Sequence, residues 1–180
     1  MRVKIETPRL ILRQWRRSDY KALLAIADQT FVNRWLPDWR GFDRWGRGWI
    51  KRVNRHYQID DPMKNFIQYA VTLQSGQVIG SIGTGPFEGK ELGVGYFIDE
   101  NHSNRGYMTE ALIAFTTHIF QRYGVDHLIA TVQPGNLASN AVARKAGFQY
   151  VSTIEILDNG QTEILPFHYY RLEDDHAQSQ

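Results

Sequence analysis

A short turn ahead of an amphipathic helix is the strongest candidate for binding chemistry in the sequence. It reads Asn104-Arg105-Gly106, and the apolar pattern that begins at Met108 is typical of a helix. A helix N-terminus presents backbone N–H groups without intrahelical partners and the positive end of the helix dipole, so it attracts anions. Gly106 has no Cβ and would let the backbone approach such an anion closely. No P-loop lysine follows the turn. Its absence favours an anion that is only bound there, and not a phosphoryl group that is transferred.

A second group of polar residues follows a later predicted strand. Asn136 comes directly after Pro134-Gly135, and Ser139 lies three residues further on at the start of a helical pattern. Asn136 could hydrogen bond amide groups of a ligand, or its side chain could form a turn with its own backbone. Ser139 could donate its hydroxyl proton to a leaving group, or it could serve as a helix N-cap. Both interpretations remain open for each residue.

The composition limits the reaction types. The chain has 180 residues, of which 42% are hydrophobic, and a net charge of +2, which fits one compact domain and does not indicate a nucleic-acid partner. It has no cysteine, which excludes disulfides, thiolate metal ligands and a covalent acyl-cysteine intermediate. The first residues lack a long apolar segment, and no run approaches the ~18 apolar residues of a membrane span. We therefore expect a cytoplasmic protein without a membrane segment.

The elements that must position these groups begin with a strand and a helix. Residues 9–13 predict a short edge-type strand after a proline. Apolar residues between 22 and 27 recur at helical spacing, and either Ser18 or Asp19 could cap that helix.

An antiparallel meander of three strands is expected next. The apolar period changes from about 3.6 to 2 over segments 67–73, 78–82 and 92–98. A Ser75-Gly76 turn joins the first two segments, and a loop through Gly85-Pro86 and Gly89 joins the last two. Gly93 and Gly95 weaken the third strand unless the backbone bulges there or something approaches it closely.

The second half of the chain alternates helices and strands. The helix from Met108 ends where Gly124 stands as a left-handed C-terminal residue, and a strand follows over 125–132. A strand, helix and strand in one sheet require a right-handed parallel crossover, so the sheet must be mixed. The remaining expected elements are a helix over 138–146 ended by Gly147, a strand from Phe148, a turn at Asp158-Asn159-Gly160 and a last strand over 167–172.

These elements predict an α+β fold. Its sheet is mixed and mostly antiparallel, with a parallel splice in the middle and helices on its flanks. We expect one domain over residues 1–180, with a core over 7–172 and a polar tail over 173–180. The splice should leave a gap in the sheet, and the functional groups should lie there.

Four separate motifs carry a resemblance to a known family. They are the strand ending Gly95-Tyr96-Phe97-Ile98, the turn and helix over 104–111, the helical segment 136–148 and the opening segment Thr7-Pro8-Arg9-Leu10-Ile11-Leu12-Arg13. In this order and spacing, over residues 7 to about 172, they resemble the GNAT acetyltransferases. Within that superfamily the chain is most similar to the RimJ/RimL ribosomal-protein N-acetyltransferase branch.

The resemblance implies direct transfer of an acetyl group from acetyl-coenzyme A to a primary amine, with no metal. The spectator pyrophosphate of coenzyme A would be the anion at the turn. The superfamily signature usually begins with Arg or Gln and ends with Gly or Ala, where this chain has Ser103 and Met108. The cofactor-binding residues that the resemblance implies are Phe97, Ile98, Ser103, Asn104, Arg105, Gly106, Tyr107, Met108, Thr109, Asn136, Asn140 and Arg144.

The resemblance also implies the acid and the base. Ser139 would protonate the leaving thiolate, and Glu155 matches the region where RimL-type enzymes carry an acidic residue. Glu91, Glu110 and His102 compete with Glu155 for the role of base. An α-amine with a pKa near 7.7 to 8.0 needs a weaker base than a lysine near 10.4 does, which favours the N-terminus of a protein or peptide as acceptor. The resemblance implies that this acceptor protein is ribosomal. A small amine, such as an antibiotic, a polyamine or an amino acid, is the alternative acceptor.

A non-catalytic module that binds RNA or the ribosome is the competing class of function. Residues 33–57 hold four of the five tryptophans and seven Lys or Arg but only two acids, and such a mixture can stack on RNA. We expect instead a helix over 42–57, with Asp43 as a cap, whose aromatic stripe packs inward while its basic face is solvated. Direct nucleic-acid binding is then not expected. The sequence does not indicate the oligomeric state.

Overall fold

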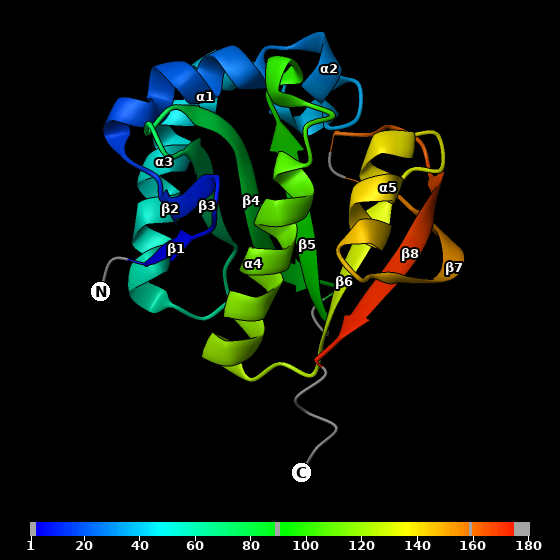
Figure 1. The fold of residues 1–180 in the computed structure, drawn as a ribbon. Coiled ribbons are helices and arrows are strands. Elements are labelled where there is room, and N and C mark those ends of the chain that lie inside the picture. Colours follow the sequence, from blue (N-terminus) through cyan, green and yellow to red (C-terminus); the bar gives the residue numbers. More distant parts are fainter. Residues whose placement is uncertain (1–2, 89–90, 159, 175–180) are drawn as a thin grey trace.

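The protein is built on one long mixed sheet, shown in the computed structural model of Figure 1, which describes residues 3–88, 91–158 and 160–174. Within these residues the sheet has eight strands, in the order β1-β2-β3-β4-β5-β6-β8-β7. The strands are β1 (Lys4–Glu6), β2 (Leu10–Gln14), β3 (Ile67–Leu73), β4 (Val78–Phe87), β5 (Glu91–Ile98), β6 (His127–Val132), β7 (Gln149–Ile156) and β8 (Leu165–Glu173). The helices are α1 (Tyr20–Ala27), α2 (Thr30–Asn33), α3 (Phe42–Ile59), α4 (Tyr107–Tyr123) and α5 (Leu137–Lys145), with 3-10 turns η1 (Arg17–Asp19), η2 (Pro37–Trp39) and η3 (Glu100–His102).

The splice in the middle of the sheet confirms the predicted fold class. β5 and β6 run parallel and are joined through α4, whereas the other neighbouring strands pair antiparallel. The parallel register consists of the pair Gly93 and Ile129. A mixed α+β sheet with one parallel pair and flanking helices is therefore the architecture of the described chain.

Helices cover both faces of the sheet, and each face has its own core. Strand residues alternate between the two: in β3, Tyr69 and Val71 face the core beneath α4, while Ala70 faces the core beneath α1 and α3. The first core continues under α5 through Phe148 and Tyr170. α4 and α5 thus pack on one face and α1 and α3 on the other (Figure 1).

Two strand predictions were wrong at their boundaries. The strand predicted at the edge, β2, lies between β1 and β3. The edge position belongs to β1, whose three residues are too few to show a period in the sequence. β4 continues through Gly85-Pro86, where we expected a loop. Its register with β3 ends at Thr84, so Pro86 lies where β4 pairs with β5 on one side. Gly89 and Asn159 lie outside the described residues.

The helix starts also differ from the expected caps. Gly41, with φ +69°, is the N-cap of α3, and Asp43 lies in its first turn. Asp19 precedes α1 without capping it through its side chain. Its buried carboxylate instead accepts hydrogen bonds from both terminal nitrogens of Arg13, at 2.7 and 2.9 Å, and from the backbone N–H of Arg16.

The end of the chain is more structured than the composition indicated. Glu173 belongs to β8, so the predicted polar tail begins after the last strand, and residues 175–180 lie outside the described part. Among the described residues, no helix is long and apolar enough to cross a membrane.

The aromatic stripe of α3 packs inward, as expected: Trp49 and Val53 are buried, and Trp45 and Tyr57 are partly buried against the same core. The ring of Trp39 lies 5.4 Å from Phe42 and 5.2 Å from Trp49, both of which are buried. It also lies 4.6 Å from Phe97 of β5. The basic side chains of Arg47, Lys51, Arg52 and Arg55 are exposed along α3. These tryptophans therefore stabilise the face of the sheet beneath α1 and α3 and are not free to stack on RNA bases.

Candidate active site

The splice between β5 and β6 opens into a cavity of about 340 Å³. Beyond Gly93 the two strands no longer pair, so Val94 to Ile98 of β5 and Ala130 to Val132 of β6 line opposite walls. Gly95 has open space where a Cβ would stand, and β5 keeps its register with β4 there. Neither Gly93 nor Gly95 forms a bulge. Gly95 lines the cavity and leaves room for close approach to the backbone, whereas a Cβ at Gly93 would make only ordinary contacts.

The N-terminus of α4 forms one end of the cavity. Gly106 is the N-cap, with φ +75°, and no side chain caps the helix. Gly106, Tyr107, Met108 and Thr109 line the cavity, so the N–H groups of the first turn are placed at its wall without a capping oxygen. The side chain of Met108 itself is buried in the core beneath α4. The cradle that this turn offers to an anion is therefore made of backbone groups.

The residues before Gly106 contribute differently from one another. Ser103 and Asn104 line the cavity, and the hydroxyl of Ser103 donates to the carbonyl of Glu100 at 2.7 Å. Arg105 is exposed and lies outside the lining, although its carbonyl accepts from Nη1 of Arg9 at 3.0 Å. The structure thus does not bring the Arg105 side chain into the cavity.

The start of α5 forms the opposite wall. Asn136 is the N-cap, and its Oδ1 accepts from the backbone N–H of Ser139 at 3.1 Å. The alternative that Ser139 caps the helix is therefore wrong. Ser139 lines the cavity, its carbonyl accepts from the hydroxyl of Tyr96 at 3.1 Å, and its own hydroxyl has no hydrogen-bond partner among the described residues. That hydroxyl is available to a bound molecule.

Asn140 has a structural role, which corrects its assignment to cofactor binding. Its side chain is buried, and Nδ2 donates to the carbonyls of Gln133 and Asn136 at 3.0 and 2.8 Å. Oδ1 accepts from Nδ1 of His168 at 2.8 Å and from the hydroxyl of Tyr170 at 2.7 Å. With both donors and both acceptor positions occupied, Asn140 fixes the start of α5 to β6 and β8. Arg144 is exposed and outside the cavity lining, which Lys145 joins instead.

Three of the four carboxylate and imidazole candidates for the base lie away from the cavity. Glu155 is exposed on β7 and does not line it. Glu91 accepts from Tyr169 and pairs with Nε2 of His127 at 2.9 Å. Glu110 accepts from Arg9; burial opposes its charge, but the hydrogen bonds from the N-terminal segment lower the pKa of Glu110 below its usual value.

The fourth candidate, His102, lines the cavity together with Asp158, an acid that the sequence did not single out. Among the described lining residues, these two carry the imidazole and carboxylate groups. Nδ1 of His102 lies 2.6 Å from Oδ2 of Asp99, whose other oxygen accepts from Gln29 at 2.7 Å. Burial acts against the charge of Asp99, but these hydrogen bonds lower its pKa, so Asp99 holds Nδ1–H and leaves Nε2 as an acceptor.

A second carboxyl group stands beside Asp158. Burial and the negative charge of Asp158 raise the pKa of Asp38 in η2 to about 6, although part of the Asp38 side chain remains exposed. The loop of Asp158 packs closely on η2, because a Cβ at Gly160 would lie 2.5 Å from the backbone nitrogen of Asp38. Asp158, which lines the cavity, thus has a second acid beside it, although Asp38 itself does not line the cavity.

Aromatic and aliphatic side chains complete the cavity on the side of α2. Phe31, Trp35 and Leu36 line it from α2 and the following residues, and Phe167 lines it from β8. A Cβ at Gly135 would lie 3.6 Å from the Trp35 ring, so the segment after α2 also reaches the loop before α5. No linear pattern could have revealed these residues, because they come from segments far apart in the chain. In the described part of the chain, no group of three or more His, Asp or Glu side chains is arranged to hold a metal.

Fold and cavity define the class of protein. The chain belongs to the GNAT acetyltransferases, because residues 9–149 match the model of the acetyltransferase (GNAT) domain. It is therefore an enzyme of the GNAT type.

Individual relatives agree with this assignment. The uncharacterized N-acetyltransferase YnaD of Bacillus subtilis (strain 168) is 24% identical over 147 residues, which cover 81% of this chain and 82% of YnaD. A solved acetyl transferase from Salmonella typhimurium, described as modifying the N-terminal serine of ribosomal protein L7/L12, superposes with a TM-score of 0.81 at 21% identity and covers 96% of this chain and 100% of its own. RimJ of Mycobacterium smegmatis, solved in complex with CoA-disulfide, superposes with a TM-score of 0.79 at 20% identity. The match covers 99% of this chain and 89% of the RimJ chain. The similarity to the RimJ and RimL proteins is one of fold.

Proposed function

We propose that this enzyme transfers the acetyl group of acetyl-coenzyme A directly to a primary amine, most favourably the α-amine of a protein or peptide. The observation that carries the proposal is the convergence of three features on one cavity. These are the uncapped N-terminus of α4, the unpaired edge of β5 and the free hydroxyl of Ser139. We also propose that residues 1–180 form a single acetyltransferase domain and that it works in the cytoplasm.

The residues at the cavity fit acetyl-coenzyme A. The backbone at Gly106 and the first turn of α4 would hold the pyrophosphate, with Ser103, Asn104, Tyr107 and Thr109 around it. The backbone of Phe97 and Ile98 and the free Nδ2 side of Asn136 would hold the pantetheine amides. Bound acetyl-coenzyme A supplies the thioester that the amine attacks.

Ser139 and one titratable group would move the protons. The hydroxyl of Ser139 donates a proton to the leaving sulfur, for which its lack of another partner suits it. Nε2 of His102 or the carboxylate of Asp158 accepts the proton from the acceptor amine, in place of the exposed Glu155. The substitutions His102→Ala and Asp158→Asn, compared by the pH dependence of kcat/KM, assign this role: loss of the rising acidic limb identifies the base.

The acceptor proposal rests on the chemistry of the amine. A free α-amine is roughly a quarter neutral near pH 7.4, so a modestly basic group suffices, whereas a lysine side chain needs a strong one. The candidate bases in the cavity, the imidazole of His102 and the carboxylate of Asp158, are of this modest kind. The fold similarity to a protein described as modifying an N-terminal serine of a ribosomal protein supports a ribosomal acceptor.

A small apolar amine is the second candidate acceptor. Phe31, Trp35 and Phe167 form an apolar wall, and Asp158 stands beside them as a partner for an ammonium group. This arrangement would suit an amine on an aryl or alkyl body as well as the first residues of a peptide.

A panel of acceptors separates these proposals. Release of coenzyme A should be measured with peptides whose α-amine is free or formylated, and with small aromatic and aliphatic amines. Activity on the free peptides alone supports N-terminal acetylation, while activity on small amines alone contradicts it. No release from any amine, despite binding of acetyl-coenzyme A, contradicts the catalytic proposal.

The anion cradle has its own test in the two glycines of α4. Gly106 and Gly124 both have positive φ, +75° and +59°, so alanine strains both ends of the helix alike. Because Gly106 alone of the two lines the cavity, Gly106→Ala should weaken acetyl-coenzyme A binding at least ~10-fold, the cost of one lost charge-assisted hydrogen bond, while Gly124→Ala leaves it unchanged. Calorimetry measures both affinities, and equal affinities would remove this turn from the site.

A further inference from the structure

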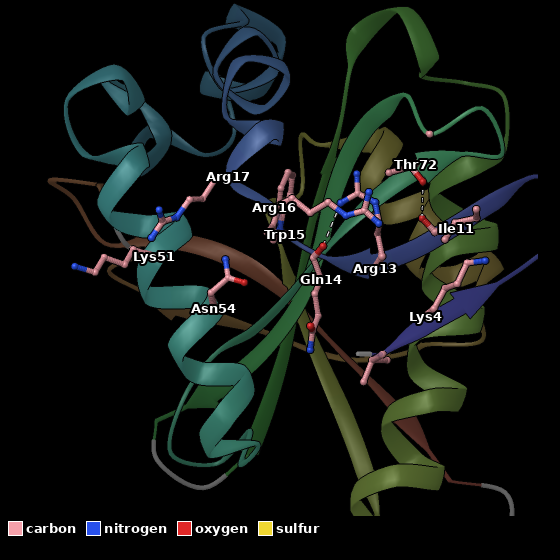
Figure 2. Close-up of a pocket in the computed structure, with 12 residues that line it drawn as sticks. Lys4, Ile11, Arg13, Gln14, Trp15, Arg16, Arg17, Lys51, Asn54 and Thr72 are labelled. Atoms are coloured by element: carbon pink, nitrogen blue, oxygen red, sulfur yellow. Dashed lines mark hydrogen bonds between the residues drawn. The ribbon is translucent and has the colours of Figure 1, made fainter. Parts of the chain in front are cut away.

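A second cavity, of about 880 Å³, lies between α3 and the β1–β2 edge of the sheet (Figure 2). α1 and α3 cover the same face over β3 and β4 but leave it open at β2. The cavity shares none of its lining residues with the acetyltransferase cavity. Its volume lies within the ~300–1,000 Å³ of small-ligand pockets.

The charges around this cavity are of one sign. The described lining includes five cationic side chains and no carboxylate: Lys4, Arg13, Arg16, Arg17 and Lys51. Two of them are neutralised from outside the lining, Lys4 by Glu6 and Arg13 by Asp19. The other three have no ion-pair partner among the described residues, which leaves an uncompensated positive charge around the hollow.

The position of the arginines is held by the fold. Asp19 binds Arg13 with two hydrogen bonds and also accepts from the backbone of Arg16, so one buried carboxylate orients both residues. In Figure 2 the side chains of Arg13 and Arg16 point toward one another. Asp19 compensates the charge of Arg13, whereas Arg16 has no ion-pair partner among the described residues, so an anion between the two side chains would supply the missing negative charge.

The rest of the wall suits the body of a small molecule. Val3, Ile11 and Trp15 supply apolar surface, and the buried indole N–H of Trp15 has no acceptor among the described residues. Arg16 and Arg17 follow β2, while Lys51 comes from α3, so the cations surround the hollow from different elements. A tetrahedral phosphate presents oxygens in several directions at once and matches such a set better than a planar carboxylate does.

We propose that this cavity binds a small phosphate-bearing molecule, at a site separate from that of acetyl-coenzyme A. Its phosphate lies between Arg13 and Arg16, with Arg17 and Lys51 at the rim, and its body lies on the apolar wall. The ring of Trp15 contacts Trp49 at 5.9 Å, and Trp49 contacts Trp39, which touches Phe97 of the acetyltransferase cavity. The two sites are thus joined through one packed aromatic cluster.

Calorimetry with inorganic pyrophosphate tests the site in protein saturated with coenzyme A, which keeps the probe out of the first cavity. We expect saturable binding that the substitution pair Arg16→Gln and Arg17→Gln weakens roughly 10-fold or more. Lys51→Gln, on a different element, should weaken it as well. The control pair Arg44→Gln and Arg55→Gln removes the same charge from exposed positions of α3 outside the lining and should leave binding unchanged.

Several results would overturn the proposal. Absence of saturable binding in the presence of coenzyme A, or equal weakening in the control pair, would show that no second site exists. Citrate binding as tightly as pyrophosphate would contradict the preference for phosphate. Displacement of pyrophosphate by single-stranded RNA, with a steep dependence on salt, would make the cavity part of a nucleic-acid surface instead.

Discussion

At the scale of single residues, the site depends on which polar groups already have partners. Asn140 has its hydrogen-bonding capacity filled by the connection from β6 to α5 and by β8, and Glu110 is held by the N-terminal segment. Ser139 is the contrasting case, because its backbone groups are bonded while its hydroxyl has no hydrogen-bond partner in the described part of the chain. A side chain that faces a cavity without an internal partner is the one that can change partners during a reaction.

Replacement of this serine should therefore affect the chemical step. Ser139→Ala is expected to lower kcat by about 10²- to 10⁴-fold, the range of a lost general acid, with little change in acetyl-coenzyme A affinity. Steady-state kinetics with a peptide acceptor measure this, and Ser18→Ala, at an exposed serine outside the cavity, is the control. An unchanged kcat would leave Ser139 with a positioning role only.

The pair of neighbouring acids Asp38 and Asp158 predicts a dependence of stability on pH. Because the pKa of Asp38 is raised to about 6, the folded protein binds a proton more tightly than the unfolded chain, and stability falls as pH rises from about 4 to 6. Asp38→Asn should thus stabilise the protein above pH 6, by up to about 1 kcal/mol after allowance for solvent screening, and the gain should vanish toward pH 4. Urea unfolding at several pH values measures it, with the exposed Asp28→Asn as control. A pH-independent gain would contradict the raised pKa.

At the scale of elements, the cavity is assembled by contacts between segments that are distant in sequence. α4 and β5 line the side that we propose for the cofactor, while α2, the residues after it and the connection from β7 to β8 line the side that we propose for the acceptor. The connection is held against η2 by the close approach of Gly160 to the backbone of Asp38. These two segments should therefore be coupled in stability and in acceptor binding.

A pair of glycines isolates this contact. Gly160→Ala would place a Cβ 2.5 Å from the Asp38 nitrogen, whereas Gly76→Ala meets open space; both residues have positive φ, +74° and +90°. Both substitutions strain the backbone in the same way, so the difference between them reports the clash at Asp38. Gly160→Ala should lower the free energy of unfolding by about 1–3 kcal/mol more than Gly76→Ala does. Denaturant titration measures the difference, and acceptor KM should rise in Gly160→Ala alone. Equal destabilisation would show that the two loops are not in firm contact.

At the scale of the whole molecule, the splice divides the sheet into two parts. β1 to β5 lie on one side of it and β6, β8 and β7 on the other, and the parallel register between the parts is the single pair Gly93 and Ile129. A ligand in the cavity contacts β5 and α4 as well as β6 and α5. It would hold the two parts together and stabilise the folded state.

Coenzyme A should consequently raise the melting temperature. At a free concentration of 100 times Kd the stabilisation is about 2.7 kcal/mol. For a chain of 180 residues this corresponds to a rise of roughly 5–11 °C. Thermal scanning fluorimetry measures the shift, and a truncated analogue without the pyrophosphate should give a smaller one. No shift with intact coenzyme A would contradict the proposed cavity.

The sequence by itself determined the kinds and order of the longer elements, but not the short β1 and α2. The changes of apolar period predict α3, α4 and the three-stranded meander, and the order of strand, helix and strand requires the parallel splice. The turn at Gly106 was also predictable, because the cradle consists of backbone groups whose position follows from the start of α4. Local patterns suffice where a feature arises from neighbouring residues.

Only the tertiary structure decided which side chains share the cavity. Glu155 and Asp158 stand three residues apart, yet one is exposed on a strand and the other lines the cavity. Strand residues alternate between faces, and a loop's direction depends on what it packs against, so a motif cannot distinguish these two acids. Trp35, His102 and Phe167 reach the same cavity through long-range packing that leaves no mark on the local sequence.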